Sequence, residues 1–342
     1  MREAQEEAPD HGGMAGLWPV HRLLTAQPEP PFNDPAVQEW VWGRQWGVLD
    51  DVGQIRLVLL CRPGEEWNPM MAGGEWNEKA EAWISPDRQW YWMGKERPDL
   101  EKAQAQHDAL AEALRREGAE VVYLTNRLPN KTRSVFTRDV ALAVPGGAVL
   151  CRMGTAYRRG EELPFGRRLM ELGMPILLTI HGCGLVEGGS FAILNRHTAV
   201  LGLSHRINAE GARQLRLLLQ DLEIELMTID LPGSVYHIDG ALVMVDHDKA
   251  LINCQWLPYW FVERLGKMGI QTLDASPDEG PFAVNCLAVR PGRVLMSERA
   301  KRTAEVLDKA GVEVVMLDFT EIPKCGGGIH CSTLPLIRDG PP

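Results

Sequence analysis

DVALAVPGGAVLC at residues 139–151 contains two β-rich runs separated by PGG, which predicts a pair of strands joined by a tight turn. EELPFGRRLMELG follows at 161–173 and predicts a helix, and its closing Gly173 suits a left-handed C-cap. The apolar run MPILLTI begins at Met174 and predicts a third strand. Residues 139–180 therefore predict one β–β–α–β unit.

The same order of elements recurs on both sides of this stretch. Strand pairs are expected at 190–202, 240–254 and 285–296, with 55–62 pairing with the last strand, 328–337. Helices that lead into a further strand are expected at 99–118, 209–222, 259–269 and 298–311. Such a unit buries its faces only against its neighbours, so we expect an α/β fold of five radial units with strand ends near a central channel. A doubly wound sheet would need single strands alternating with helices and a Gly-rich phosphate loop, and the sequence has neither.

The composition is that of an ordinary globular protein. The chain has 342 residues, of which 45% are hydrophobic and 24% charged, and its formal net charge is −10. This acidic balance lacks the electrostatic footprint of a nucleic-acid-binding protein. A small anionic or zwitterionic ligand remains compatible, because the charge at a site can oppose the global sign.

Three features predict a cytoplasmic location without membrane attachment. No apolar run reaches the roughly 18 residues that a spanning helix needs. The acidic start, MREAQEEAPDHGGMAG, lacks the basic and apolar segments of a signal peptide and predicts a floppy tail over residues 1–16. The seven cysteines are odd in number and scattered, so we expect reduced thiols rather than a disulfide framework.

Residues 40–92 carry eight of the eleven tryptophans. The stretch EEWNPMMAGGEWNEKAEAW at 65–83 follows neither a helical nor a strand period, and predicts an ordered excursion. We interpret it as a packed surface loop or a dimer contact in preference to a lid over a substrate. Exposed tryptophans would favour a homodimer.

Residues that can carry chemistry recur where the first strand of each unit begins. Asp139 ends FTRD, Glu187 begins EGGS, His237 and Asp239 lie in HIDGAL, and Cys331 lies in CGGGIHCST. Two carboxylates can hold a planar guanidinium through charge-assisted hydrogen bonds while a thiolate attacks its central carbon. His237 would protonate the leaving amine and later deprotonate a water molecule.

Each of these residues also has an ordinary structural interpretation. A free cysteine often packs as a small hydrophobe, but the three glycines before Cys331 permit a close backbone approach to a ligand or strand. Cys325, His330 and Cys331 lack the fourth ligand of a zinc site, and we expect neither a metal nor another cofactor. The remaining cysteines lie in or beside apolar runs and are predicted to be core: Cys61, Cys151, Cys183, Cys254 and Cys286.

Arginines follow the strand pairs of two units. Arg206 ends GLSHR, and Arg152, Arg158 and Arg159 hold the analogous place in the preceding unit. Any of them could bind a substrate carboxylate in a bidentate manner, and each could equally be a solvated turn residue.

At these residues the sequence resembles the guanidino-group modifying enzymes of the pentein superfamily. These include arginine deiminase, dimethylarginine dimethylaminohydrolase and the arginine:glycine amidinotransferases. The matching segments are DDVGQIRLVLLCRPG at 50–64, FTRD at 136–139, EGG at 187–189, GLSHR at 202–206, HIDGAL at 237–242, NCLAVRPG at 285–292 and GGGIHCSTLPLIRD at 326–339. They follow the expected order over nearly the whole chain.

The resemblance implies a five-bladed α/β propeller forming a single catalytic domain over residues 46–342, after an N-terminal extension at 1–45. It implies that Cys331 is the nucleophile, His237 the acid and base, and that Glu187 orients His237. It further implies that Asp139 and Asp239 bind the guanidinium of the substrate and that Arg206 binds its carboxylate. The sequence departs from the family at Ser190, where Asp or Asn often follows EGG, and in the tryptophan-rich segment.

Three functions agree with this reading to different degrees. We expect a hydrolase of arginine or a methylated arginine, either a deiminase or a dimethylargininase. An amidinotransferase shares the covalent half-reaction but passes the amidino group to an amine. A non-enzymatic binding propeller, like some translation factors, would not need the cysteine, the histidine and the acids together.

Overall fold

The computed structural model describes residues 18–23, 30–280 and 282–341. Its repeated element is a three-stranded sheet with one helix. In the unit predicted over residues 139–180, β7 (Gly147–Leu150) pairs antiparallel with β6 (Ala141–Val144) and parallel with β8 (Ile176–Thr179). Helix α5 (Glu162–Leu172) connects β7 to β8. The predicted β–β–α–β unit is confirmed.

Three later units repeat this order and pairing. The first of them consists of β9 (Phe191–Asn195), β10 (Thr198–Leu203), α6 (Ala209–Asp221) and β11 (Glu225–Asp230). The next consists of β12 (Leu242–Asp246), β13 (Lys249–Ile252), α7 (Tyr259–Lys267) and β14 (Gln271–Asp274). The last consists of β15 (Leu287–Arg290), β16 (Arg293–Ser297), α8 (Lys301–Lys309) and β17 (Glu313–Leu317).

The two ends of the domain combine in the remaining unit. Strand β1 (Ile55–Leu60) pairs antiparallel with β18 (Leu334–Arg338) and parallel with β5 (Glu120–Tyr123), which follows α4 (Leu100–Arg116). The pairing of the first and last strands is confirmed, although β18 begins later than the expected residue 328. The residues before Leu334 form a turn instead, which brings Cys331 to the start of the strand.

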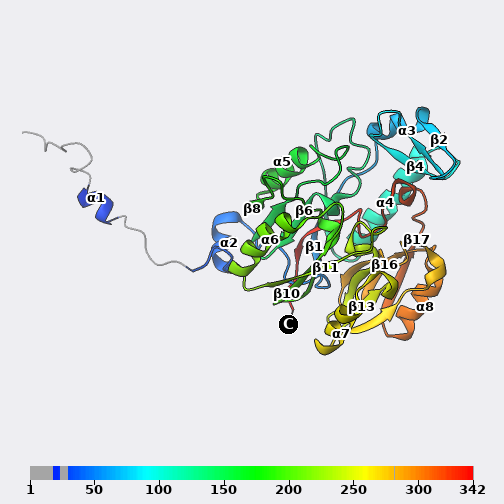
Figure 1. Ribbon diagram of the computed structural model, residues 1–342. Coiled ribbons are helices and arrows are strands. Elements are labelled where there is room, and N and C mark those ends of the chain that lie inside the picture. The colour runs from blue at the N-terminus through cyan, green and yellow to red at the C-terminus, as the bar shows by residue number, and fades with distance from the viewer. Residues whose placement is uncertain (1–17, 24–29, 281, 342) are drawn as a thin grey trace, which may run out of the picture.

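The five units are separate sheets rather than one continuous sheet. Hydrogen bonds hold each three-stranded sheet together, and no ladder within the described ranges joins the units into a closed sheet. Strand β12 contacts β9 and β15, and β18 contacts β6, so the first strands of the units lie beside one another. Figure 1 shows α5, α7 and α8 at the periphery of the molecule. This arrangement places the strand starts inside and the helices outside.

The helices end where the sequence predicted. Gly173 is the left-handed C-cap of α5, with φ +86°. Gly118, Gly269 and Gly311 follow α4, α7 and α8 with φ between +80° and +90°. Glycine is favoured there because it carries no Cβ that would strain a left-handed backbone.

The tryptophan-rich segment departs from the repeat. It contains a short helix α3 (Asn68–Ala72) and a sixth sheet of β2 (Glu75–Asn77), β3 (Ala82–Ile84) and β4 (Tyr91–Met93). Trp67 and Trp92 are fully buried, and their rings meet edge to face with centroids 5.3 Å apart. The expected ordered excursion is confirmed, and its base is part of the hydrophobic core.

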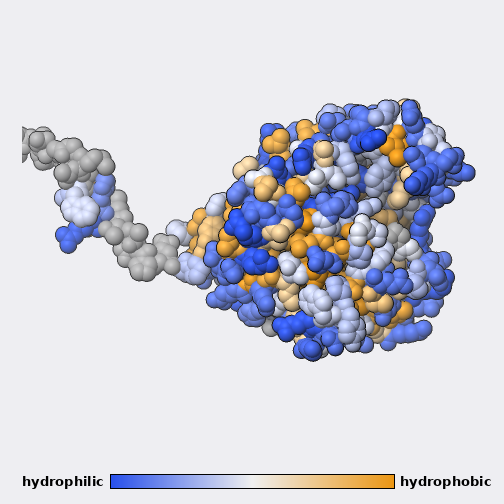
Figure 2. All heavy atoms as spheres, viewed as in Figure 1, coloured by the Kyte–Doolittle hydropathy of each residue, from blue (hydrophilic) through white to orange (hydrophobic). Residues whose placement is uncertain are grey.

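Two short helices precede the first unit: α1 (Trp18–Leu23) and α2 (Pro35–Trp42). Helix α2 is fixed to the domain by Gln38, whose side-chain amide donates to the carbonyl of Gly146 at 2.7 Å. The floppy tail expected over residues 1–16 lies outside the described residues. Trp40 on α2 is 81% exposed, and the homodimer stays a prediction. Figure 2 shows apolar residues interspersed with hydrophilic ones on the visible face.

The cysteines and helices bear on the predicted compartment. All seven cysteines are free thiols, as expected. The core assignment is correct for Cys61, Cys151 and Cys286 but wrong for Cys183 and Cys254, which are exposed. Both lie in turns just beyond a strand, where the preceding apolar run has already ended. Within the described ranges, no helix combines the length and apolar character needed to cross a bilayer. The cytoplasmic location stays a prediction.

The pairing of β1 with β18 generates a stability prediction. Arg338 is buried, and its guanidinium donates to the carbonyls of Gly53 at 2.6 Å and Ala288 at 2.8 Å. Arg338→Ala leaves both acceptors without this donor, so we expect the free energy of unfolding to fall by about 2–4 kcal/mol. Urea denaturation measures the change.

Arg56→Ala is the matched control, since Arg56 lies on the paired strand and binds Asp339 with a side chain that is 54% exposed. Exposed ion pairs contribute little, so the control should change the free energy of unfolding by less than about 1 kcal/mol. Equal losses for the two variants would contradict the prediction.

Candidate active site

The candidate site is assembled from the turns that precede the first strand of each unit. Asp139 ends the 3₁₀ turn before β6, Glu187 precedes the turn before β9, and His237 precedes the turn before β12. Asn285 lies before β15 and Cys331 before β18. Successive turns contact one another, so side chains that are far apart in sequence meet.

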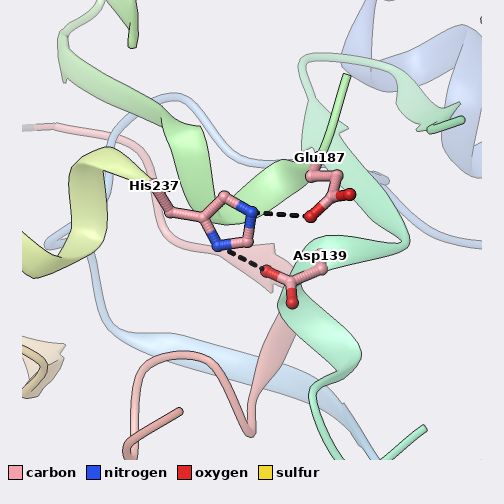
Figure 3. A group of neighbouring side chains, drawn as sticks. All are labelled: Asp139, Glu187 and His237. Atoms are coloured by element: carbon pink, nitrogen blue, oxygen red, sulfur yellow. Dashed lines mark hydrogen bonds and ion pairs between the residues drawn. The ribbon is translucent and has the colours of Figure 1, made fainter. Parts of the chain in front are cut away.

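His237 lies between two carboxylates (Figure 3). Its Nε2 is 2.7 Å from Oε2 of Glu187, and its Nδ1 is 3.4 Å from Oδ1 of Asp139. The other oxygen of Glu187 accepts a hydrogen bond from the backbone N–H of Gly154 at 2.8 Å. The imidazole is therefore held from both sides, and its ring plane is fixed.

These contacts shift the pKa values of both His237 and Glu187. Burial alone would lower the pKa of His237, but the negative charges of Asp139 and Glu187 raise it above its ordinary value. Burial would raise the pKa of Glu187, but its hydrogen bond to His237 and the nearby arginines lower it to about 2. Glu187 is therefore a carboxylate at neutral pH, and His237 retains its proton to a higher pH than a free histidine.

Cys331 lies beside a third carboxylate. Its Sγ donates to Oδ2 of Asp239 at 3.2 Å and accepts from Nδ2 of Asn285 at 3.2 Å. His330 also contacts the same carboxylate, with Nδ1 at 3.0 Å from Oδ2 of Asp239. The sulfur thus has one acceptor and one donor within hydrogen-bonding distance.

The surroundings of Cys331 favour the neutral thiol. Burial, followed by the charges of Asp239 and Asp139, raises the pKa of the thiol well above its ordinary value. Burial would also raise the pKa of Asp239, but His330 and His237 lower it. A cation placed against Asp239 would offset the charge that now opposes formation of the thiolate.

Glycines make the close approach of these turns possible. A Cβ on Gly189 would lie 2.6 Å from Oδ1 of Asp139 and 2.8 Å from Nδ1 of His237. A Cβ on Gly328 would lie 2.5 Å from Oδ1 of Asn285. The glycines of EGG and GGG therefore leave room for the site's own side chains.

Cys331, His237, Asp239 and Asn285 share a cavity of about 260 Å³. His237 and Asp239 both precede β12, because the chain enters a 3₁₀ turn at Ile238 before this strand begins. Both side chains reach the same cavity.

Asp139 is not among the residues that line this cavity. It forms a buried ion pair with Arg158, which also binds Glu161 at 2.8 Å. Its Oδ1 is buried and accepts no hydrogen bond from the described residues. The predicted contact of Asp139 with a guanidinium stays a prediction.

The four candidate arginines have different surroundings. Arg206 is buried, with Nη1 at 3.4 Å from Oε2 of Glu187 and Nη2 at 3.3 Å from the hydroxyl of Tyr157. Arg158 is fully committed to Asp139 and Glu161. Arg152 and Arg159 donate to the backbone carbonyls of Gly182, Met153 and Gly154. Of the four, Arg206 is the one that contacts Glu187 and the aromatic side chains of Tyr157 and Tyr236.

The three residues of Figure 3 are also of the types that bind metal ions. One ligand atom from each of Asp139, Glu187 and His237 lies within 4.8 Å of the others. Arg158 and Arg206 already supply positive charge to the two carboxylates. The two carboxylates are therefore suited to stabilising the charged imidazolium of His237 rather than to binding a further cation.

Sequence reasoning quoted Asn285 within NCLAVRPG but gave it no role. A signal was available, because Asn285 lies two residues before β15 just as Asp139 lies two residues before β6. Ser190, where the sequence departs from the family pattern, has a buried hydroxyl that donates to the carbonyl of Gly202 at 2.7 Å, fixing the turn behind Glu187.

Asn285 generates a prediction about thiol reactivity. Its N–H would stabilise the thiolate of Cys331, so Asn285→Ala should slow iodoacetamide alkylation of Cys331 at pH 8 by about tenfold. Peptide mass spectrometry follows the modification with time.

Exposed Cys183 in the same molecule provides an internal control, and Asn195→Ala, at the end of β9, provides the matched asparagine control. The alkylation rate of Cys183 in Asn285→Ala and that of Cys331 in Asn195→Ala should both stay close to the wild-type rates. An unaltered rate at Cys331 in Asn285→Ala would exclude the proposed hydrogen bond.

The charges around His237 generate a pH prediction. Glu187→Gln removes one of the two negative charges that raise the pKa of His237, so the imidazole should lose its proton at a lower pH than in the wild type. NMR titration of ¹⁵N-labelled histidine rings measures this shift. Glu263→Gln, at an exposed position of α7, should leave the titration where it was. An upward shift in Glu187→Gln would refute the assignment.

Comparison with known proteins shows the family. The family described as "N,N dimethylarginine dimethylhydrolase, eukaryotic" matches residues 87–338. The chain is 30% identical over 244 residues to N(G),N(G)-dimethylarginine dimethylaminohydrolase of Pseudomonas aeruginosa, covering 71% of this chain and 91% of that protein. It is 20% identical over 416 residues to arginine deiminase 1 of Staphylococcus epidermidis, covering 85% and 98% respectively.

Solved structures share the fold. Dimethylarginine dimethylaminohydrolase from Pseudomonas aeruginosa, as a Cys-to-Ser mutant complexed with citrulline, aligns with a TM-score of 0.64 at 24% identity, covering 83% of this chain and 100% of that one. Inosamine-phosphate amidinotransferase from Streptomyces griseus aligns with a TM-score of 0.67 at 18% identity, covering 87% and 98%. The extent of the family match and the identity to the Pseudomonas protein show that this chain belongs to the dimethylarginine dimethylaminohydrolase family of the pentein superfamily.

Proposed function

We propose that this protein is a hydrolase that breaks a C–N bond of arginine or a substituted arginine through a covalent intermediate on Cys331. The observation that carries the proposal is the position of the Cys331 sulfur, 3.2 Å from Asp239 in a cavity that His237 also lines. Membership of the family supports the guanidino-group chemistry.

In this proposal the substrate itself activates the nucleophile. Asp239 accepts N–H groups of the guanidinium, and the bound cation offsets the negative charge that keeps the Cys331 thiol protonated. Asp139 supplies the second acceptor through Oδ1, which has no hydrogen-bond partner among the described residues and lies 3.4 Å from Nδ1 of His237. Asn285 donates to the thiolate that results.

His237 then moves the protons. The thiolate forms a C–S bond to the central carbon, and protonated His237 gives its proton to the departing nitrogen as the C–N bond breaks. Water attacks the S-alkylthiouronium, neutral His237 takes its proton, and the C–S bond breaks to release a ureido product and the thiol. Glu187 orients His237 and stabilises its charged form.

Two further features of the site and fold complete the proposal. Arg206 binds the substrate carboxylate, because its guanidinium lies against the ring of Tyr236, which lines the cavity, and its Nε has no hydrogen-bond partner among the described residues. Residues 46–342 form one catalytic domain, with 1–45 as an extension, and the five units surround a common axis as blades. This arrangement accounts for how five separate turns supply one site.

Product analysis tests the proposed function. Incubation with arginine and with methylated arginines should yield citrulline without an added amine, and intact-protein mass spectrometry should detect a transient adduct on Cys331. Cys331→Ser should abolish both signals. Cys325→Ser is the matched control, since Cys325 is buried nearby but does not line the cavity, and it should retain turnover.

Ornithine release that requires an amine acceptor would instead establish the amidinotransferase reaction. Full turnover by Cys331→Ser would rule out the covalent mechanism in either form. Lack of both an adduct and a product with every guanidino compound tested would favour a non-enzymatic role.

A further inference from the structure

A second, larger cavity opens directly onto the one that holds Cys331. It has a volume of about 710 Å³, compared with about 260 Å³ for the inner cavity. Tyr91, Met93 and Tyr236 line both, so the two spaces are continuous. We call the larger space the outer chamber. Its volume exceeds what the remainder of a free arginine would fill once the guanidinium is at Cys331.

The outer chamber is made by the tryptophan-rich segment. The connection between the second strand and the helix spans 61–99 in the first unit, but only 204–208 in the third and 253–258 in the fourth. The longer connection contributes β2, β3 and β4, whose side chains form one wall, while Tyr157 and Tyr236 come from other units. The sequence analysis preferred a packed surface loop or dimer contact over a lid, whereas the structure places this segment at the entrance of the site.

The chamber is aromatic and firmly supported. Trp76, Trp90 and Tyr91 of the segment face Tyr157 and Tyr236 across the space. Trp90 is 8% exposed, and Trp92 between the lining residues of β4 is fully buried, so the wall is fixed to the core. Glu75 and Arg88, of opposite charge, also line the chamber. An aromatic enclosure with balanced charge suits a neutral, planar or apolar group.

Arg206 lies behind two of the aromatic rings that line these cavities, although Arg206 itself lines neither. Its Cζ is 4.5 Å from the centroid of the Tyr236 ring, and its Nη2 is 3.3 Å from the hydroxyl of Tyr157. Both rings line the outer chamber, and Tyr236 lines the inner cavity as well. A carboxylate bound to Arg206 would therefore lie against the rings of Tyr157 and Tyr236, with any further group of the substrate directed into the outer chamber.

This geometry specifies which end of the substrate is extended. The guanidinium occupies the inner cavity and the α-carboxylate is held by Arg206, which leaves the α-nitrogen as the point of attachment for a group in the outer chamber. We propose that the preferred substrates are Nα-acylated arginines, including short peptides that end in arginine. This inference rests on the proposed function and narrows its substrate class.

The test compares three substrates of the wild-type protein: free arginine, Nα-benzoyl-arginine and Nα-benzoyl-arginine amide. The benzoyl group should raise kcat/KM about tenfold or more over free arginine, because its ring is buried among the aromatic side chains. The amide lacks the carboxylate and should fall about tenfold or more below Nα-benzoyl-arginine. Free arginine equal to or better than Nα-benzoyl-arginine would overturn the inference.

Two variants of the chamber separate its role from general damage. Trp76→Ala removes part of the wall, and Ala80→Trp fills the space from an exposed turn. Each should bring the ratio of kcat/KM for the benzoylated and free substrates toward one. Trp40→Ala, at an exposed position of α2, should keep the wild-type ratio. A wild-type ratio in both chamber variants would contradict the inference.

The outcomes also separate a failure of the proposed substrate class from a failure of the proposed hydrolase activity. Citrulline formation from free arginine, with Nα-benzoyl-arginine turned over more slowly, would overturn the substrate class and leave the proposed hydrolase intact. Failure of all guanidino compounds to give a product or a Cys331 adduct would overturn both. Preferential release of Nα-benzoyl-citrulline would support both.

Discussion

The structure depends on placing a neutral thiol against a buried carboxylate. Cys331 and Asp239 lie 3.2 Å apart, and burial together with the charge of Asp239 raises the pKa of the thiol. In the proposed mechanism the same contact becomes favourable for a thiolate once a cation binds Asp239, so substrate binding would itself activate the nucleophile. Around it, Arg158 and Arg206 balance Asp139 and Glu187, which allows several ionised groups to remain buried together.

The repeated fold solves the problem of supplying these groups. Each unit contributes one short turn before its first strand, and each turn contributes one or two polar side chains. Because successive turns pack against one another, His237 receives Glu187 from a unit 50 residues earlier in the chain. The glycines beside these residues are required by the same packing: a Cβ at Gly189 or Gly328 would occupy space that His237 or Asn285 fills.

The tryptophan-rich segment shows how one unit can change the site without disturbing the others. It is inserted between β1 and α4, so the strand pairing of its unit is retained. Its buried Trp67 and Trp92 join the core, while Tyr91 and Met93 reach the catalytic cavity. In the proposed function, this part of the chain outside the repeat would govern substrate preference, whereas the residues proposed to carry the chemistry belong to the repeat.

The amino-acid sequence by itself determined the β–β–α–β units, their number, the pairing of β1 with β18 and the glycine-ended helices, because these follow from local periodicity and turn chemistry. It also pointed to His237, Asp239 and Cys331 as candidates, since their place in each unit repeats, and the structure brings all three to one cavity. It could not decide that Asn285 contacts the sulfur, that Asp139 pairs with Arg158, or that Cys183 and Cys254 are exposed. The sequence alone likewise could not predict the outer chamber. Those features depend on which turns and side chains face one another across different units, and only the tertiary packing fixes such distances.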